Sequence, residues 1–262
     1  MDAPASLPLS LPAIAWLAGA IGAVFGFAAQ RSNFCTMGAI ADIFIMEDWT
    51  RLRMWALSIA VAIIGTTGLQ VVGLIDVHNT IYTGTRVPWL SHIVGGTLFG
   101  IGMTLASGCG AKTLVRLGSG NLKSLVVFAF LGLSAYMSLR GLFGSWRVAW
   151  LDPIAIQLGT AQDIPTLLAA RFQLDSRSAW LACSSVAAGS LGLFALSRRE
   201  MWRPAALLGS LAIGGCIVAG WYLSGQLAWL AEDPDTLQAA FLATNSGRME
   251  SLSFVAPYAY SL

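Results

Sequence analysis

The sequence predicts an all-helical (all-α) protein that crosses a membrane several times. Of its 262 residues, 56% are hydrophobic and 11% are charged, which is too little polar surface to coat a soluble domain. The apolar residues also occur in long runs, and a helix needs roughly 20 residues to cross a hydrocarbon core of about 30 Å. A net charge of +2 indicates no nucleic-acid partner. We therefore expect a single polytopic membrane domain over residues 1–262, with the lipid bilayer as its surroundings.

Six apolar runs are long enough to span a membrane. Two shorter apolar segments, 34–46 and 153–172, fit helices that dip into the membrane or lie at its surface. The first eleven residues contain no Lys or Arg, so we expect the first run to be retained as a span instead of being cleaved as a signal peptide. Counting Lys and Arg in alternate loops favours an outside N-terminus only weakly. The six runs lie near residues 12–29, 54–75, 89–107, 122–144, 178–197 and 204–229.

One pattern occurs twice in the chain. Thirteen positions separate Gly22 from Cys35, and thirteen separate Gly96 from Cys109. Both stretches begin Gly-Xaa-Xaa-Phe-Gly, and each apolar run stops at a polar, glycine-containing break that holds one cysteine. Repeated broken helices are typical of transporters whose breaks face each other around a site. We expect pseudo-symmetric repeats, short re-entrant helices, and two breaks that are buried and close together. The two broken-helix motifs cover residues 12–47 and 89–120.

The glycines of the repeat also have a purely structural explanation. Small residues spaced three or four apart allow membrane helices to approach closely. This packing role is what we expect of them, and close approach would at the same time bring the two helix ends to one point. The glycines concerned are Gly19, Gly22 and Gly26 in the first run and Gly96, Gly100 and Gly102 in the third.

The two breaks have the composition of an anion-binding site. Their glycines and small polar residues supply accessible backbone N–H groups, and Lys112 and Arg116, four residues apart on one helical face, add positive charge. The alternative is that both cations extend to lipid headgroups. The predicted substrate-binding residues are Arg31, Ser32, Asn33 and Cys35 in the first break and Ser107, Gly108, Cys109, Gly110, Lys112 and Thr113 in the second.

The four cysteines fall into two classes. All lie in or beside hydrophobic segments, so a disulfide framework is not expected. The chain has no CxxC motif and only two histidines, so we expect no metal and no other cofactor. Cys183 and Cys216 fit small apolar filler residues. Cys35 and Cys109 lie in the polar breaks, where a thiol can donate weakly to a soft acceptor such as sulfur.

Both motifs resemble a known family. Phe25-Gly-Phe-Ala-Ala-Gln-Arg-Ser-Asn-Phe-Cys35 and Gly95-Gly-Thr-Leu-Phe-Gly-Ile-Gly-Met-Thr-Leu-Ala-Ser-Gly-Cys109 are similar to the two N-terminal signatures of the YeeE/YedE family of sulfur transporters, and residues 251–257 extend the likeness. The resemblance implies a bacterial inner-membrane transporter of thiosulfate or a similar sulfur anion, and not an enzyme. It also implies that Cys35 and Cys109 contact the substrate by S–H···S contacts. Family members normally continue into further helices with a third cysteine, so we expect a missing C-terminal half or a second subunit.

Two other functional classes remain open from the residues alone. A membrane thiol-disulfide carrier would also present paired cysteines, although it would not need the nearby cations. A structural subunit of a membrane complex is the third class, and it would tolerate serine at both cysteines. The chain contains no GxxxxGK[ST] phosphate-binding loop, so it is not expected to hydrolyse ATP, and Asp42 is a candidate for proton coupling.

Overall fold

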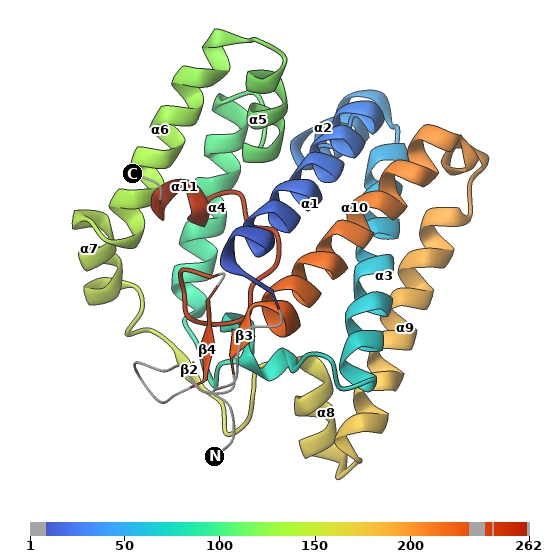
Figure 1. Cartoon of the computed structure of the whole chain (residues 1–262), viewed down its shortest axis with the longest axis vertical. Coiled ribbons are helices and arrows are strands. Elements are labelled where there is room, and N and C mark those ends of the chain that lie inside the picture. Colours follow the sequence, from blue (N-terminus) through green and yellow to red (C-terminus); the bar gives the residue numbers. More distant parts are fainter. Residues whose placement is uncertain (1–8, 231–238, 243, 261–262) are drawn as a thin grey trace.

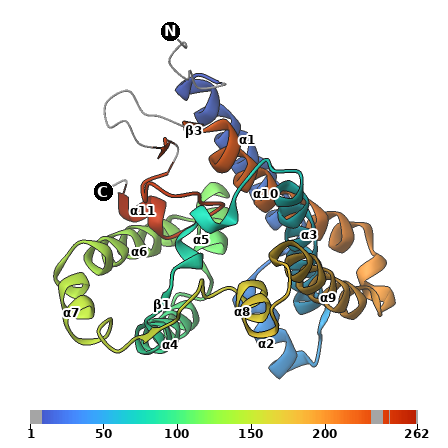
Figure 2. The ribbon, with the colours of Figure 1, turned by 90° about the horizontal axis from the view of Figure 1, so that it is seen from below.

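The protein is helical throughout, as a computed structural model of the chain shows (Figure 1). The structure describes residues 9–230, 239–242 and 244–260. Figures 1 and 2 show two groups of helices that stand side by side. The first group comprises α1 (Leu11–Ser32), α2 (Thr36–Met46), α3 (Thr50–Val71), α8 (Ile164–Phe172), α9 (Ser176–Leu196) and α10 (Pro204–Tyr222). The second comprises α4 (Trp89–Leu105), α5 (Gly110–Gly118), α6 (Leu122–Leu139), α7 (Leu142–Trp150) and α11 (Ala256–Tyr260).

Short elements connect the helices. Two antiparallel pairs of two-residue strands are present, with Arg86 opposite Gln157 in the first and Trp229 opposite Phe241 in the second. The strands are β1 (Arg86–Val87), β2 (Ile156–Gln157), β3 (Trp229–Leu230) and β4 (Ala240–Phe241). The 3-10 turns are η1 (Val77–Asn79), η2 (Ile81–Thr83) and η3 (Arg199–Trp202), and η4 (Leu223–Leu227) is a π-helical turn that follows α10.

The expected spans are confirmed. Six helical segments of the described chain are long and apolar enough to cross a membrane, and the first and third each join a long helix to the short helix after its break. The protein is therefore a multi-pass membrane protein. The expected run 122–144 is wrong in one respect, because α6 ends at Leu139 and the chain turns into α7. Gly141 makes this turn, where a Cβ atom would lie 2.8 Å from the Met137 Cα atom.

The first group contains the main core. α3 packs against both α9 and α10, and α10 also packs against α1. α3 and α10 approach each other closely, because a Cβ atom on Gly214 would lie 2.7 Å from the Ser58 carbonyl oxygen. The Ser58 hydroxyl donates to the Ser210 carbonyl oxygen at 3.0 Å, so the contact also satisfies buried polar groups. Cys216 is buried in this core, and its thiol donates to the Ile21 carbonyl oxygen at 3.7 Å.

The prediction that the repeat glycines pack helices together is wrong for the described part of the chain. A Cβ atom built on Gly19, Gly22, Gly26, Gly96, Gly100 or Gly102 meets no described atom within 4 Å. None of the seventeen residues of α4 is buried, and all of them belong to the described part of the chain. The glycines that do bring helices together lie elsewhere, at Gly65, Gly209 and Gly214, and Gly220 admits the extended segment at Ser251. Both glycine-rich faces therefore remain open.

The element order repeats in the two groups. A long helix, a break, a short helix and a second long helix follow one another as α1, α2 and α3, and again as α4, α5 and α6. In Figure 1, α1 and α4 both run upward, and α3 and α6 both run downward. The two copies therefore have the same direction with respect to the bundle.

Candidate functional site

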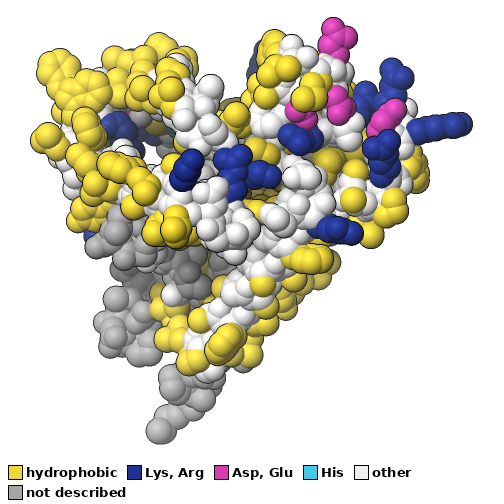
Figure 3. All heavy atoms as spheres, turned by 90° about the horizontal axis from the view of Figure 1, so that it is seen from above, with side chains coloured by type: hydrophobic (Ala, Val, Ile, Leu, Met, Phe, Trp, Pro, Cys, Tyr) yellow, Lys and Arg dark blue, Asp and Glu magenta, His cyan; other side chains and the backbone are white. Residues whose placement is uncertain are grey.

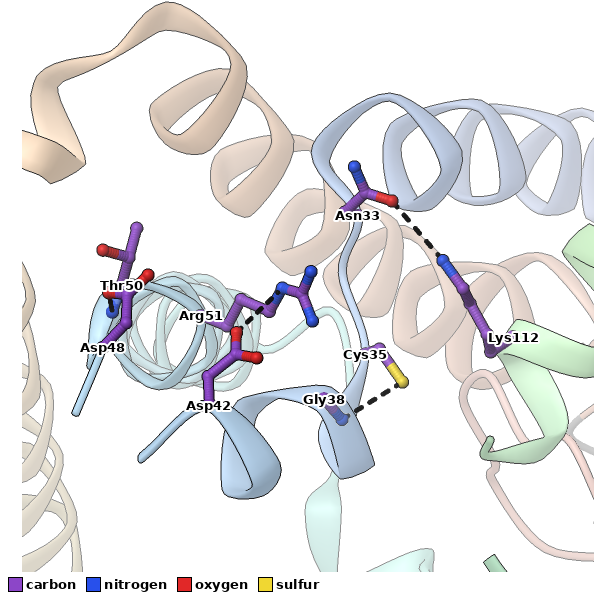
Figure 4. Close-up of polar contacts among 8 residues, drawn as sticks. All are labelled: Asn33, Cys35, Gly38, Asp42, Asp48, Thr50, Arg51 and Lys112. Atoms are coloured by element: carbon purple, nitrogen blue, oxygen red, sulfur yellow. Dashed lines mark hydrogen bonds and ion pairs between the residues drawn. The ribbon is translucent and has the colours of Figure 1, made fainter. Parts of the chain in front are cut away.

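The first break is built around a cysteine at a helix start. Asn33 takes the left-handed conformation that ends α1, with φ 53°, and its side chain can hydrogen-bond locally, which makes Asn one of the residues that tolerate it. Cys35 then adopts an extended conformation and is the N-cap of α2. The Gly38 N–H donates to the Cys35 sulfur at 3.5 Å, as Figure 4 shows. Phe34 stacks on Trp55 of α3 with ring centroids 5.0 Å apart, which fixes the break against the core.

The second break has the same local construction. Ser107 is left-handed, with φ 56°, and lies two residues before Cys109, as Asn33 lies two residues before Cys35. Cys109 is the N-cap of α5. Its carbonyl oxygen accepts from the Thr113 N–H at 3.0 Å and from the Thr113 hydroxyl at 3.2 Å. In both breaks the cysteine is therefore held by the backbone at the positive end of a short helix.

The two breaks meet. The Lys112 side chain of the second break contacts Asn33 of the first, and Cys35 and Cys109 lie close enough to influence each other electrostatically; both thiols are free. The Cys109 thiol makes no capping hydrogen bond, but the N–H groups of Lys112 and Thr36 lie near its sulfur. Each sulfur therefore has N-terminal amide groups of a short helix beside it. This confirms that the breaks approach one another.

Lys112 spans the junction between the breaks. Its ammonium group donates to the Asn33 side-chain oxygen at 3.5 Å, so a cation of the second break contacts the residue that ends α1 (Figure 4). No carboxylate among the described residues pairs with Lys112. Arg116, one turn further along α5, donates to the Ser107 carbonyl oxygen at 2.9 Å. Sequence reasoning named Arg116, from its spacing to Lys112, as a source of positive charge but did not include it among the predicted substrate-binding residues.

Burial of the breaks is uneven. Cys35 and Phe34 are buried in the first break, and Gly108 and Gly110 are buried in the second. Arg31, Asn33 and Ser107 are exposed, so the expectation of two wholly buried breaks holds only for the part next to the sulfur atoms. Figure 3 shows basic side chains gathered between the two groups of helices, with the acidic side chains of this view on one side.

Two further residues are occupied elsewhere. The Ser32 hydroxyl donates to the Ala28 carbonyl oxygen at 2.6 Å, and its side chain fills the space above Gly209 of α10. Asp42 forms an ion pair with Arg51 at 3.2 Å (Figure 4), which gives its carboxylate a fixed partner on α3.

A groove lies between α1 and α5. It has a volume of about 540 Å³, and it is lined by Gly22 and Gly26 of α1, Ala111 and Val115 of α5, and Leu252 and Phe254 of the C-terminal segment. Phe254 lies against Gly110, the residue that follows Cys109, at 3.7 Å from the position of a Cβ atom. The groove is thus adjacent to the cysteine pair. Sequence reasoning gave the C-terminal segment no role, because an extended segment has no helical periodicity to indicate what it contacts.

Comparison with known proteins identifies the family. Residues 31–262 match the family described as Sulphur transport. The chain belongs to this family. The thiosulfate transporter TsuA of Escherichia coli (strain K12) is 34% identical over 117 residues, which is 44% of this chain and 32% of that protein. The thiosulfate transporter TsuA of Spirochaeta thermophila is 29% identical over 146 residues, or 54% of this chain and 42% of that protein.

Membership confirms the YeeE/YedE resemblance and places the chain in a family of transporters, not of enzymes. The aligned parts span less than half of each thiosulfate transporter. The names of these relatives therefore do not establish which sulfur compound this chain transports or by which path.

Proposed function

We propose that this chain belongs to a transporter that imports thiosulfate, or a closely related sulfur anion, across a bacterial inner membrane through a path that passes Cys35 and Cys109. The meeting of the two breaks, whose cysteines lie 74 positions apart, is the observation that carries the proposal: the Lys112 ammonium group donates to the Asn33 side-chain oxygen at 3.5 Å, and both thiols are free. Thiosulfate has an anionic sulfonate end and a soft terminal sulfur. Amide groups at the starts of α2 and α5, together with Lys112, suit the charge, and the two thiols suit the sulfur.

The contact with each thiol is non-covalent in this proposal. An S–H group donates to the terminal sulfur, and the anion passes from one thiol to the next without a change in oxidation state. Asn33 and Ser107, each two residues before a cysteine, set the direction in which the following short helix leaves the break. Gly108 and Gly110 flank Cys109 and leave room for the anion near its sulfur. Arg31 and Thr113 act from the edges of the site, the latter through the Cys109 carbonyl oxygen, and Ser32 acts only by holding the end of α1 through its bond to the Ala28 carbonyl oxygen.

Uptake of labelled thiosulfate tests this proposal. Cys35→Ala and Cys109→Ala should nearly abolish uptake at normal membrane abundance, in cells without other sulfur importers. Cys216→Ala and Cys183→Ala are the matched controls, and both should transport, because neither lies at a break. Serine should rescue poorly, since its hydroxyl is a harder group than a thiol. Normal uptake by Cys109→Ala at equal abundance would contradict the proposal.

The complete path is proposed to need further helices, from a longer form of this protein or from a second polypeptide. Two observations support this. α4 has no buried residue, and the aligned part covers less than half of each thiosulfate transporter. Residues 1–262 alone should give little uptake, and addition of the remaining helices of a relative should restore it. Full uptake by residues 1–262 alone would refute this part of the proposal, and the cysteine variants must be compared in whichever form transports.

A thiol-disulfide carrier is the second candidate, because two free thiols at adjoining breaks are also what such a carrier requires. Lys112 and the amide groups around both sulfurs favour an anion instead. Incubation of membranes with a partner protein that carries a disulfide distinguishes the carrier from the transporter. A trapped mixed disulfide at Cys35 or Cys109, without any thiosulfate uptake, would favour the carrier.

A further inference from the structure

An extended segment runs alongside α10. Residues 250–255 form neither helix nor strand. At one end, the Met249 N–H donates to the Asn79 carbonyl oxygen in η1, at 3.1 Å. At the other end, the Phe254 ring lies 5.1 Å from the Phe25 ring of α1 and next to Gly110 of α5. The segment therefore leads from the η1 end of the molecule to the cysteine pair.

Side chains fasten this segment to α10 at membrane depth. The Ser251 hydroxyl donates to the Ile217 carbonyl oxygen at 2.8 Å, and the Ser224 hydroxyl donates to the Glu250 carbonyl oxygen. Ile217 lies within a predicted membrane span, Pro204–Leu227. Gly220 makes the close approach possible, because a Cβ atom there would lie 2.7 Å from the Ser251 hydroxyl oxygen. The sequence of α10 and of the turn that follows it therefore supplies both the space and the hydrogen bonds for this contact.

The N–H groups in the middle of this segment lack a partner among the described residues. The N–H groups of residues 251–254 donate to no described residue. An unpaired N–H group in hydrocarbon costs several kcal/mol, and irregular backbone occurs at membrane depth only where it is buried in protein or lines a watery cavity. Ser253 is exposed, and Leu252 and Phe254 line the groove next to Cys109. Neighbouring N–H groups of an extended segment point in opposite directions, so some of them face away from α10.

We propose that residues 250–255 line a water-filled part of the substrate path, and that their N–H groups donate to the oxygen atoms of the anion on its way between the η1 end and Cys109. This rests on the proposed thiosulfate function and deepens it. The thiols offer soft contacts to the terminal sulfur, and the extended backbone offers hard donors to the sulfonate oxygens. Because N–H groups carry no net charge, they bind the anion without holding it as strongly as a row of cations.

Labelling of an introduced cysteine tests the proposal. The Ser253→Cys variant of the complete transporter is prepared in membrane fragments, so that both faces of the membrane are accessible. It is treated with a membrane-impermeant sulfonated maleimide, and labelled peptides are identified by mass spectrometry. Phe130→Cys, an exposed position on α6, is the matched control for a side chain facing lipid. We expect labelling at residue 253 but not at 130, and several-fold slower labelling of both residue 253 and native Cys109 when thiosulfate is present.

The outcomes separate the two proposals. Lack of labelling at residue 253 would overturn the inference, because the segment would then be covered by lipid or by another polypeptide. Labelling at 253 that is insensitive to thiosulfate, while Cys109 is protected, would also overturn it and leave the proposed function standing. If thiosulfate protects neither residue, the proposed function fails and the inference fails with it.

A pair of variants distinguishes the backbone from the side chain. Ser253→Pro removes the N–H donor and keeps an extended conformation accessible, whereas Ser253→Ala removes only the hydroxyl. We expect Ser253→Pro to raise the thiosulfate concentration needed to protect Cys109, and Ser253→Ala to leave it unchanged. Equal protection in both variants would refute a role for the backbone donor.

Discussion

The glycines of α10 and α1 are predicted to respond in opposite ways to the same substitution. A Cβ atom on Gly214 would lie 2.7 Å from the Ser58 carbonyl oxygen and 2.8 Å from the Val61 Cβ atom, both on α3. A backbone oxygen cannot rotate away, so α3 and α10 must separate. Overpacking of this kind costs about 1–3 kcal/mol, and alanine recovers about 0.5–1 kcal/mol of helix propensity. We expect Gly214→Ala to lower the free energy of unfolding by about 0.5–2 kcal/mol on balance.

Gly22→Ala is the matched comparison. Its Cβ atom meets no described atom within 4 Å, so the propensity gain of up to about 1 kcal/mol is not opposed by any contact. Denaturant titration of the purified protein in mixed micelles, followed by near-UV circular dichroism, measures both variants. Equal stabilities, or a larger loss for Gly22→Ala, would refute the close approach of α3 and α10. Uptake gives a second measurement, since Gly22→Ala should impair transport without loss of stability if the groove carries substrate.

Three further substitutions test the site and its support. Lys112→Gln should reduce thiosulfate uptake partially and mainly raise KM, because it lowers the positive potential but leaves both thiols, and Lys123→Gln, at the exposed start of α6, is the control. If Lys112→Gln and Lys123→Gln reduced thiosulfate uptake equally, a local role for Lys112 at the site would be excluded. Ser107→Gly should keep uptake and raise the melting temperature slightly, whereas Ser107→Val should lower both, since a β-branched residue is strained at φ 56°. Arg53→Ala should lower the melting temperature without affecting uptake at matched abundance, because Arg53 donates to the Phe194 carbonyl oxygen at 2.6 Å at the C-terminal end of α9. An Arg53→Ala variant with the melting temperature of the wild type would show that the contact between Arg53 and Phe194 does not contribute to stability.

The spans and the cysteine pair follow from local sequence. Long apolar runs leave little choice in a bilayer, and the repeated spacing to Cys35 and Cys109 indicated two equivalent breaks, which the structure brings together. The breaks themselves were recognisable from their polar residues, but the left-handed conformations at Asn33 and Ser107 were not predicted. Both conformations depend on where the preceding helix ends, and a helix end is poorly defined by composition.

Other features depend on contacts that local sequence does not encode. The repeat glycines looked like packing positions because of their spacing, yet the tight contacts occur at Gly65, Gly209, Gly214 and Gly220, which are set by how α10 crosses its neighbours. The turn into α7 depends on a single residue, Gly141. The segment at residues 250–255 has no periodicity, and its position follows from side chains of α10 that are distant in sequence.

The common direction of the two repeats restricts how the protein can expose its site to each side of the membrane. α1 and α4 run the same way, and so do α3 and α6, so the two copies are parallel repeats and not inverted ones (Figure 1). In transporters with inverted repeats, an exchange of conformation between the halves converts an outward-open state into an inward-open one. When parallel copies exchange conformations, the site stays open to the same side of the membrane. An exchange of conformation between the two copies within residues 11–139 would therefore not by itself convert one open state into the other.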